Sequence, residues 1–115
     1  MRPITLGLAV LGALALAACD SDPTRPLAGP EIAPALVGET LAIGTSAQQS
    51  FFADGTMVWV EGAEEQGTWR VEGDQVCFDW DGARSDGCFV VRAGGGIVEF
   101  VGPSGDVLQA QTGDT

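Results

Sequence analysis

The sequence contains no histidine, no lysine and no tyrosine, and its five basic residues are all arginines. Nucleophilic catalysis of the serine or cysteine type needs a histidine base, so the chain lacks the parts for it. With 16 acidic residues and a net charge of −11, the chain would be repelled by a phosphate backbone, which argues against nucleic-acid binding. The glycine triplet at 94–96 has no lysine or helix start behind it, so we expect a hairpin loop there. We therefore expect a protein that is not an enzyme and uses no cofactor.

A transmembrane-length apolar run is also missing. The uncharged stretch from Ile4 to Ala18 is too short for a hydrocarbon core of ~30 Å, which needs roughly 20 helical residues. It follows the positive charge of Arg2 and ends in small residues, which is the layout of a signal peptide. We therefore expect residues 1–18 to be a signal peptide.

The segment Leu16-Ala17-Ala18-Cys19 resembles the lipobox of bacterial lipoproteins. This resemblance covers residues 1–19 and implies cleavage before Cys19, a diacylglycerol on its sulfur and often a further acyl chain, such as palmitate, on the new amino end. It also implies a lipid-anchored, periplasm-facing domain in the bacterial cell envelope. Two or three acyl chains would anchor the protein firmly, because each buried methylene contributes about 0.8 kcal/mol. Asp20 resembles a lineage-dependent signal for the inner membrane, so the choice between inner and outer membrane stays open.

Four prolines, at positions 23, 26, 30 and 34, follow Cys19 within a short stretch. We interpret residues 19–34 as a lipidated, proline-rich tether, whose extended chain would hold a domain up to about 45 Å from the membrane. The tether is either a spacer of chosen reach or unstructured chain that follows the anchor. Residues 35–115 then form one small β domain.

From Leu36 onward, short β-rich runs alternate with turn signals. Asp-Gly and Gly-X steps supply the positive φ that hairpin turns need, and all links are short. We therefore predict an all-β fold, a small antiparallel up-and-down meander or barrel of about 7–8 short strands. The expected strands are Leu36–Gly44, Ser50–Ala53, Thr56–Glu61, Gln66–Glu72, Gln75–Asp81, Gly87–Arg92, Ile97–Val101 and Asp106–Gln111.

Two cysteines remain besides Cys19, namely Cys77 and Cys88. When the hairpin is folded about Gly82-Ala83, the two fall opposite each other on one face, at the cross-strand distance that a disulfide needs. An even pair of cysteines in an exported chain also favours a disulfide. A metal site is the alternative, but two sulfurs without a histidine make a poor zinc ligand set, so we expect no bound metal.

The stretches LVGETLAI, FFADGTMVW, GTWRVEGDQVCFDW and DGCFVV resemble, in this order, the strands and turns of small lipocalin-like bacterial domains. The resemblance covers roughly residues 36–111 and lies mostly in turn and core residues, so it implies the architecture far more than an activity. The strands are short, and the first one carries Gly38-Glu39-Thr40 where true lipocalins have Gly-x-Trp. Both departures argue against a large ligand cavity.

Eight aromatic residues, three of them tryptophans, either fill the core of a small β domain or belong to a binding surface. The candidate binding residues are Trp59, Trp69 and Trp80. Three aspartates lie close together within residues 79–86, which leaves a calcium site as an alternative to solvated acids near Arg84. The spacing does not match an EF-hand, which favours the solvated acids.

Together these patterns predict an exported, membrane-anchored lipoprotein with a non-catalytic interaction or structural role in the envelope. Its acidity serves solubility or attracts a basic envelope protein. The alternative is a lipocalin-like binder of a small apolar molecule. A tryptophan-lined cavity above ~300 Å³ would favour the binder, and a filled barrel with an exposed apolar patch of several hundred Å² would favour the interaction role.

Overall fold

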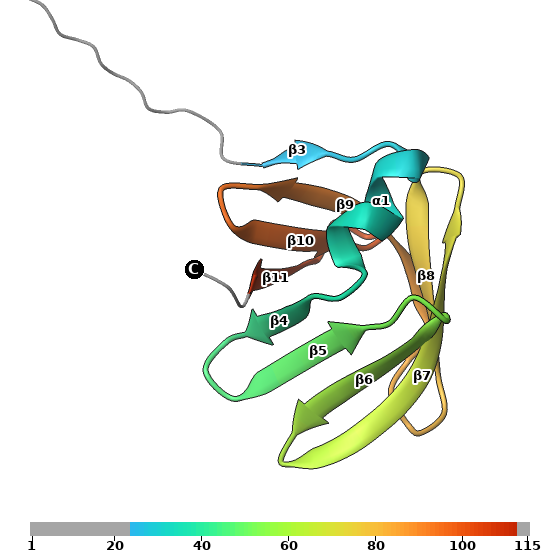
Figure 1. Cartoon of the computed structure of the whole chain (residues 1–115), viewed down its shortest axis with the longest axis vertical. Coiled ribbons are helices and arrows are strands. Elements are labelled where there is room, and N and C mark those ends of the chain that lie inside the picture. Colours follow the sequence, from blue (N-terminus) through green and yellow to red (C-terminus); the bar gives the residue numbers. More distant parts are fainter. Residues whose placement is uncertain (1–23, 113–115) are drawn as a thin grey trace, which may run out of the picture.

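The computed structural model describes residues 24–112, which form one short helix and a nine-stranded sheet (Figure 1). No helix within this range is long and apolar enough to cross a membrane. In chain order the elements are β3 (Arg25–Pro26), α1 (Gly29–Leu36), β4 (Thr40–Ile43), β5 (Ala47–Phe51), β6 (Thr56–Glu61), β7 (Ala63–Glu72), β8 (Gln75–Trp80), β9 (Gly87–Gly94), β10 (Ile97–Val101) and β11 (Val107–Thr112).

Strands β4 to β11 form a closed antiparallel barrel in which each strand pairs with its neighbours in sequence. The barrel closes between β11 and β4, where only Gln111↔Ala42 and Thr112↔Leu41 are paired. The first half of β11 therefore extends past the end of β4. This topology confirms the predicted all-β, up-and-down barrel of short strands.

The two-residue strand β3 is an addition to the barrel. It pairs with the far half of β9, beyond the point where β8 begins, through Arg25↔Ala93 and Pro26↔Arg92. The side chain of Arg92 donates a hydrogen bond of 3.0 Å to the carbonyl oxygen of Thr24. An uncovered strand edge is a site for unwanted pairing, and β3 covers this part of β9.

The expected strands agree with the observed ones best in the middle of the chain. Thr56–Glu61 and Ile97–Val101 are strands β6 and β10 with the bounds expected. The expected first strand, Leu36–Gly44, is only partly a strand, because its first residues complete α1 and the turn after it. The strand expected at Gln66–Glu72 begins earlier, at Ala63, because β6 and β7 stay paired up to the tight turn that joins them.

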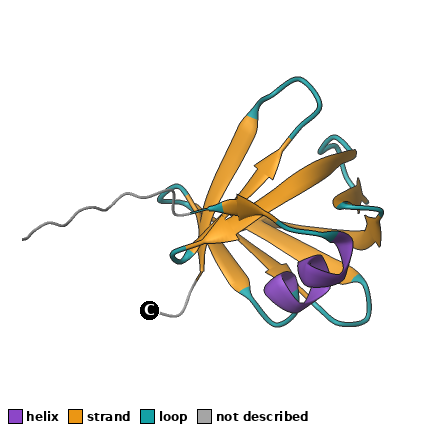
Figure 2. Ribbon diagram, turned by 90° about the horizontal axis from the view of Figure 1, so that it is seen from above, coloured by secondary structure: helices purple, strands orange, loops and turns teal. Residues whose placement is uncertain are grey.

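Helix α1 packs against one end of the barrel, the end on which Figure 2 looks down. Ile32 and Leu36 lie four residues apart, so they share one face of the helix, and both are fully buried in the core. The expectation of an extended tether over residues 19–34 is therefore wrong for residues 24–34, which are paired or packed. Residues 19–23 lie outside the described residues.

We call the end that carries α1 the plugged end.

The start of α1 is fixed by hydrogen bonds that compensate for its short length. The Glu31 carboxylate accepts a bond of 2.9 Å from the backbone N–H of Ala28, and Asp74 Oδ1 accepts one of 2.7 Å from the backbone N–H of Gly29. Pro30 stands in the first turn, where proline is tolerated because that position has no intrahelical donor role. These hydrogen bonds allow a proline-rich segment to form a helix.

The centre of the barrel is filled by aromatic rings. The centroid of Phe51 lies 5.8 Å from that of Phe78 and 6.2 Å from that of Phe100. A barrel of about eight strands has an interior that side chains can just fill. Inward positions alternate along the strands, as in β6, where Met57 and Trp59 are buried and the residues on either side of them are more exposed.

Cys77 and Cys88 form a disulfide between β8 and β9, with an S–S distance of 2.08 Å. The two residues are direct partners in the strand register. This confirms both the predicted pairing and the predicted register of the hairpin. The connecting residues, 81–86, extend beyond Gly82-Ala83, and Asp86 Oδ1 accepts a hydrogen bond of 2.7 Å from the backbone N–H of Trp80.

Candidate functional site

The end of the barrel opposite α1 is the candidate site, and we call it the open end. It is formed by the turns at residues 44–46, 62, 81–86 and 102–106, which share one end because consecutive strands alternate in direction (Figure 1). The plugged end is covered by α1, whereas here the strands lead into loops alone.

A cavity of about 150 Å³ lies inside the open end. Its walls are mostly aromatic, and the rings of Trp59 and Trp80 meet edge to face with centroids 6.3 Å apart. An apolar cavity of this volume accommodates a molecule about the size of benzene. It is smaller than the ~300 Å³ expected of a drug-sized ligand site. The lining residues are Gln49, Trp59, Phe78, Trp80, Arg84, Ser85, Phe89, Phe100 and Leu108.

Trp80 reaches its position because the residue opposite it is a glycine. Gly67 and Trp80 are direct partners between β7 and β8. A Cβ on Gly67 would lie 3.0 Å from Trp80 Cε3 and 2.5 Å from the carbonyl oxygen of Asp79. The missing side chain therefore leaves the space in which the Trp80 ring stands.

Arg84 lies over the mouth of the cavity. Its guanidinium carbon is 3.9 Å from the centre of the Trp59 ring and 5.5 Å from that of Trp80, which is cation–π geometry. Its Nε donates a hydrogen bond of 2.8 Å to Glu65 Oε1. Both side chains of this ion pair are about one-third exposed, at 33% and 34%, so the pair is reachable by solvent. Arg84 thus partly closes the cavity without sealing it.

Gln49 is a buried polar residue in the wall of this apolar cavity. Its side chain is fully buried, and its Nε2 donates only a weak, 3.5 Å hydrogen bond to the sulfur of Met57. Its Oε1 has no hydrogen-bond partner among residues 24–112. A buried acceptor without a donor is costly, and such groups are rare enough in folded proteins that each one calls for a reason.

The turns of the open end are strongly acidic. Of the described residues on these turns and on the adjoining ends of β6 and β7, six are acidic and one, Arg84, is basic. A cluster of like charges around a low-dielectric cavity raises the local concentration of ions of the opposite sign. The acidic residues are Glu61, Glu64, Glu65, Asp81, Asp86 and Asp106.

Of the three tryptophans predicted as binding residues, the structure brings only two together. Trp59 and Trp80 line the cavity, whereas Trp69 packs edge to face against Phe51, with centroids 5.8 Å apart. The indole N–H of Trp69 donates a 3.1 Å hydrogen bond to the carbonyl oxygen of Phe52, near the plugged end. Trp69 therefore lies outside the cavity that Trp59 and Trp80 line.

The sequence predictions did not include Gln49, and they included Arg84 only as a charge that screens nearby acids. Alternation along β5 puts Gln49 in phase with the buried Ala47 and Phe51, so a strand extended by a few residues would have revealed it. The stacking of Arg84 on Trp59 had no comparable signal, because the two residues are far apart in sequence.

Metal ligands are not assembled at the open end within residues 24–112. Among the described residues, the potential metal ligands that lie close together are Glu72, Cys77 and Cys88, away from the open end. The two sulfurs of this group are joined in the disulfide. Two of the aspartates near residue 80 have other partners, since Asp79 is paired with Arg70 and Asp86 accepts a hydrogen bond from the backbone N–H of Trp80.

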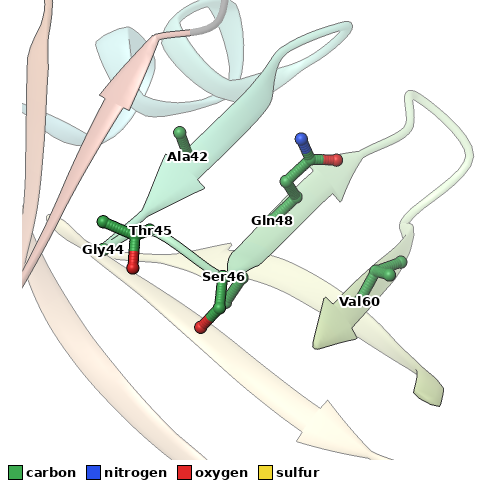
Figure 3. A pocket seen from close by; sticks show the side chains of 7 residues that line it. Ala42, Gly44, Thr45, Ser46, Gln48 and Val60 are labelled. Carbon is green, nitrogen blue, oxygen red and sulfur yellow. The ribbon is translucent and has the colours of Figure 1, made fainter. Parts of the chain in front are cut away.

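A second hollow, of about 190 Å³, lies on the outer face of the β4–β5 hairpin (Figure 3). Figure 3 shows Gln48 and Val60 projecting from neighbouring strands, with Thr45 and Ser46 at the turn beside them. Among the described residues that line it, none is charged, and no buried polar atom there lacks a partner. It offers less to a ligand than the cavity lined by Trp59 and Trp80 does.

Comparisons with protein-family models, with curated proteins and with solved structures found no match to this chain.

Proposed function

We propose that this protein is an exported lipoprotein, anchored in the bacterial envelope through Cys19, whose barrel is a non-catalytic binding module. The observation that carries the proposal is the position of β3. Its Arg25 pairs with Ala93, next to the β9–β10 turn at the plugged end. An anchor on Cys19 would therefore hold the plugged end toward the membrane and leave the open end facing away.

The link between anchor and barrel is short. From Cys19 to Thr24 there are five residue steps, which span at most about 18 Å even when fully extended. The barrel would thus stand close to the membrane surface. A tether that reached Pro34 would instead allow a distance of up to about 45 Å. A short link favours a fixed orientation, because the barrel cannot turn its open end toward the lipid without lengthening the link.

Export is supported by the Cys77–Cys88 disulfide, because disulfides persist in oxidising compartments and are reduced in the cytosol. A non-catalytic role is supported by the composition, since the chain has no histidine, lysine or tyrosine to act as a base or nucleophile. The binding role is supported by the open end, which combines a cavity, acidic turns and the exposed Val107 and Leu108. Such a surface suits a basic partner in the envelope.

A second candidate function is a lipocalin-like binder of a small apolar molecule. The cavity at Trp59 and Trp80 favours it, but its volume restricts the ligand to a few heavy atoms. The two candidates place their ligand at the same end of the barrel, so they share the anchoring test below and differ in what occupies the cavity.

The anchor is tested by fractionation of cells that express the full chain or the Cys19→Ser variant. The unchanged chain should be found in the membrane fraction, and Cys19→Ser should be released or remain unprocessed. If Cys19→Ser is processed normally and stays in the membrane to the same extent, the anchor is wrong.

The orientation is tested with one fluorescent label at either end of the full chain, in vesicles that contain brominated lipid as a quencher. Ala28→Cys places the label at the plugged end and Ser46→Cys at the open end, and both positions are exposed. We expect strong quenching at position 28 and little at position 46. Equal quenching at both positions would contradict an open end that faces away from the membrane.

A further inference from the structure

The open end already holds one cation against its aromatic wall. Arg84 lies 3.9 Å from the centre of the Trp59 ring and is part of the chain itself. Aromatic walls attract cations through the negative face of the ring, and several such rings around one space form the cages that recognise organic ammonium groups. The cavity behind Arg84 is walled by Trp59, Trp80 and three phenylalanines.

The acceptor for such a ligand is the carboxamide of Gln49. Gln49 and Trp59 are direct partners between β5 and β6, so their side chains are neighbours on the inner face. Gln49 lines the cavity, and its Oε1 is buried and lacks a donor among the described residues. Because this atom can only accept a hydrogen bond, the ligand group that satisfies it must carry an N–H or O–H.

The charge of the open end selects among donors. Six acidic residues lie on the turns of the open end or on the adjoining ends of β6 and β7, and the one described basic residue there, Arg84, is already paired with Glu65. This field favours a cation over a neutral donor and disfavours an anion. Glu65 would also be left without its partner if Arg84 moved, and an incoming cation would replace that charge.

We propose that the open-end cavity binds a small organic cation, an ammonium group on a short apolar stem, whose N–H donates to Gln49 Oε1 while Arg84 moves off Trp59. The cavity volume of about 150 Å³ limits the ligand to about the size of benzene. Arg84 acts as an internal competitor that occupies the aromatic wall until the ligand displaces it. This proposal rests on the binding role proposed above and gives that role a ligand class.

The ammonium group has two sources, a free amine or a lysine side chain of a basic envelope protein. Both present the same chemistry to Trp59 and Gln49. A free amine enters the cavity alone, whereas a lysine brings a polypeptide that also contacts the acidic turns. The acidic field attracts both, but only a lysine-containing peptide also makes direct contacts with the charges outside the cavity.

The test is a titration of the full chain, purified in detergent, with n-butylammonium chloride, followed by the indole N–H signals in NMR spectra. We expect a saturable shift of the Trp59 and Trp80 signals and none of the Trp69 signal, which serves as the internal control. The neutral analogue n-butanol should bind at least about tenfold more weakly, because it lacks the cation–π attraction. Butyrate should not bind. Equal binding of n-butanol, or no saturation by n-butylammonium, overturns the proposal.

Three variants separate the roles of the side chains. Gln49→Leu keeps the volume and removes the acceptor, so it should weaken n-butylammonium binding about fivefold or more. It should also unfold at the same or a higher denaturant concentration, because it removes an unpaired buried group. Arg84→Ala should tighten binding, because the competitor is gone, and the matched control Arg70→Ala, on the outer face, should leave binding unchanged. Unchanged binding by Gln49→Leu, or weaker binding by Arg84→Ala, contradicts the mechanism.

The source of the ammonium is decided by competition between n-butylammonium and a short peptide with blocked ends and one central lysine. Tighter binding of the peptide assigns the site to a protein partner, and binding of the amine alone assigns it to a free ligand. A negative titration together with the expected quenching at positions 28 and 46 would overturn this inference and leave the anchored orientation intact. A positive titration without the expected quenching would do the reverse.

Discussion

Trp80 stands over Gly67, the residue directly opposite it on the neighbouring strand, where a Cβ would come within 3.0 Å of the Trp80 ring. The same Cβ would lie 2.5 Å from the carbonyl oxygen of Asp79, which belongs to the backbone and cannot rotate away. One glycine thus sets the position of a wall of the cavity.

The first prediction follows from this contact. Gly67→Ala should destabilise the barrel by about 1–3 kcal/mol, because a methyl group is forced into a packed site, and it should shift the indole signal of Trp80. The measurement is urea unfolding together with NMR. Gly82→Ala is the matched control, because its nearest neighbour, Glu65 Oε2, would be 3.8 Å away, which is ordinary contact. Equal stability of the two variants would show that the Gly67 position tolerates a side chain.

The second prediction concerns the disulfide. The double variant Cys77→Ala/Cys88→Ala should lose roughly 3 kcal/mol of unfolding free energy, because the crosslink closes a loop of about a dozen residues in the unfolded chain. Urea unfolding with and without a reducing agent measures this loss. The unchanged chain under reducing conditions should match the double variant, and the double variant itself should not respond to the reducing agent. If the unfolding midpoint were the same for all samples, the disulfide would contribute nothing to the free energy of unfolding.

The barrel was predictable from the sequence because its signals are local. Turn residues and alternating apolar positions mark β6 to β10, and Cys77 and Cys88 give the register of one hairpin independently of the turn. Closure between β11 and β4 depends on only two residue pairs, whose members are about 70 residues apart in sequence, so no local pattern predicts it.

Helix α1 was not predictable in the same way. Pro30 and Pro34 suggest extended chain, and the pair that commits the segment to a helix, Ile32 and Leu36, has the right spacing over a single turn only. A helix this short is marginal by itself in water. What stabilises it is the barrel end that buries these two side chains, and that end exists only after the strands have assembled.

The candidate site was predictable in part. Trp59 and Trp80 stood out as large side chains, and the structure brings them together, but Trp69 looked equivalent in sequence and lies elsewhere. Gln49 was missed because the strand expected at Ser50–Ala53 began three residues later than β5, which begins at Ala47. Pairing of a residue with a partner distant in sequence, as between Arg84 and Glu65, depends on the tertiary fold.

The third prediction tests α1 as a plug. Ile32→Ala should cost about 2–5 kcal/mol, because a fully buried side chain is truncated and leaves a cavity in the core. Pro34→Ala is the control on the same helix, since Pro34 is exposed and alanine is a far better helix former. It should be neutral or stabilising in the same denaturant series. If Ile32→Ala unfolds at the wild-type midpoint, the segment adds nothing to the barrel.

The fourth prediction is a pH dependence at the plugged end. A hydrogen bond from the Arg25 side chain, and a second from the backbone N–H of Ala28, lower the pKa of Glu31 from its ordinary value of 4.5. Because the pKa is lower in the folded chain, the ionised carboxylate favours folding above the ordinary value, and this contribution is lost as the pH falls through the folded pKa. Thermal midpoints measured from pH 7 to pH 3 should therefore fall less in Glu31→Gln than in the unchanged chain. Added salt should reduce the difference between them, because Arg25 and Glu31 are exposed and their attraction is screened. Parallel curves for the two proteins would mean that this carboxylate contributes nothing to the loss of stability in acid.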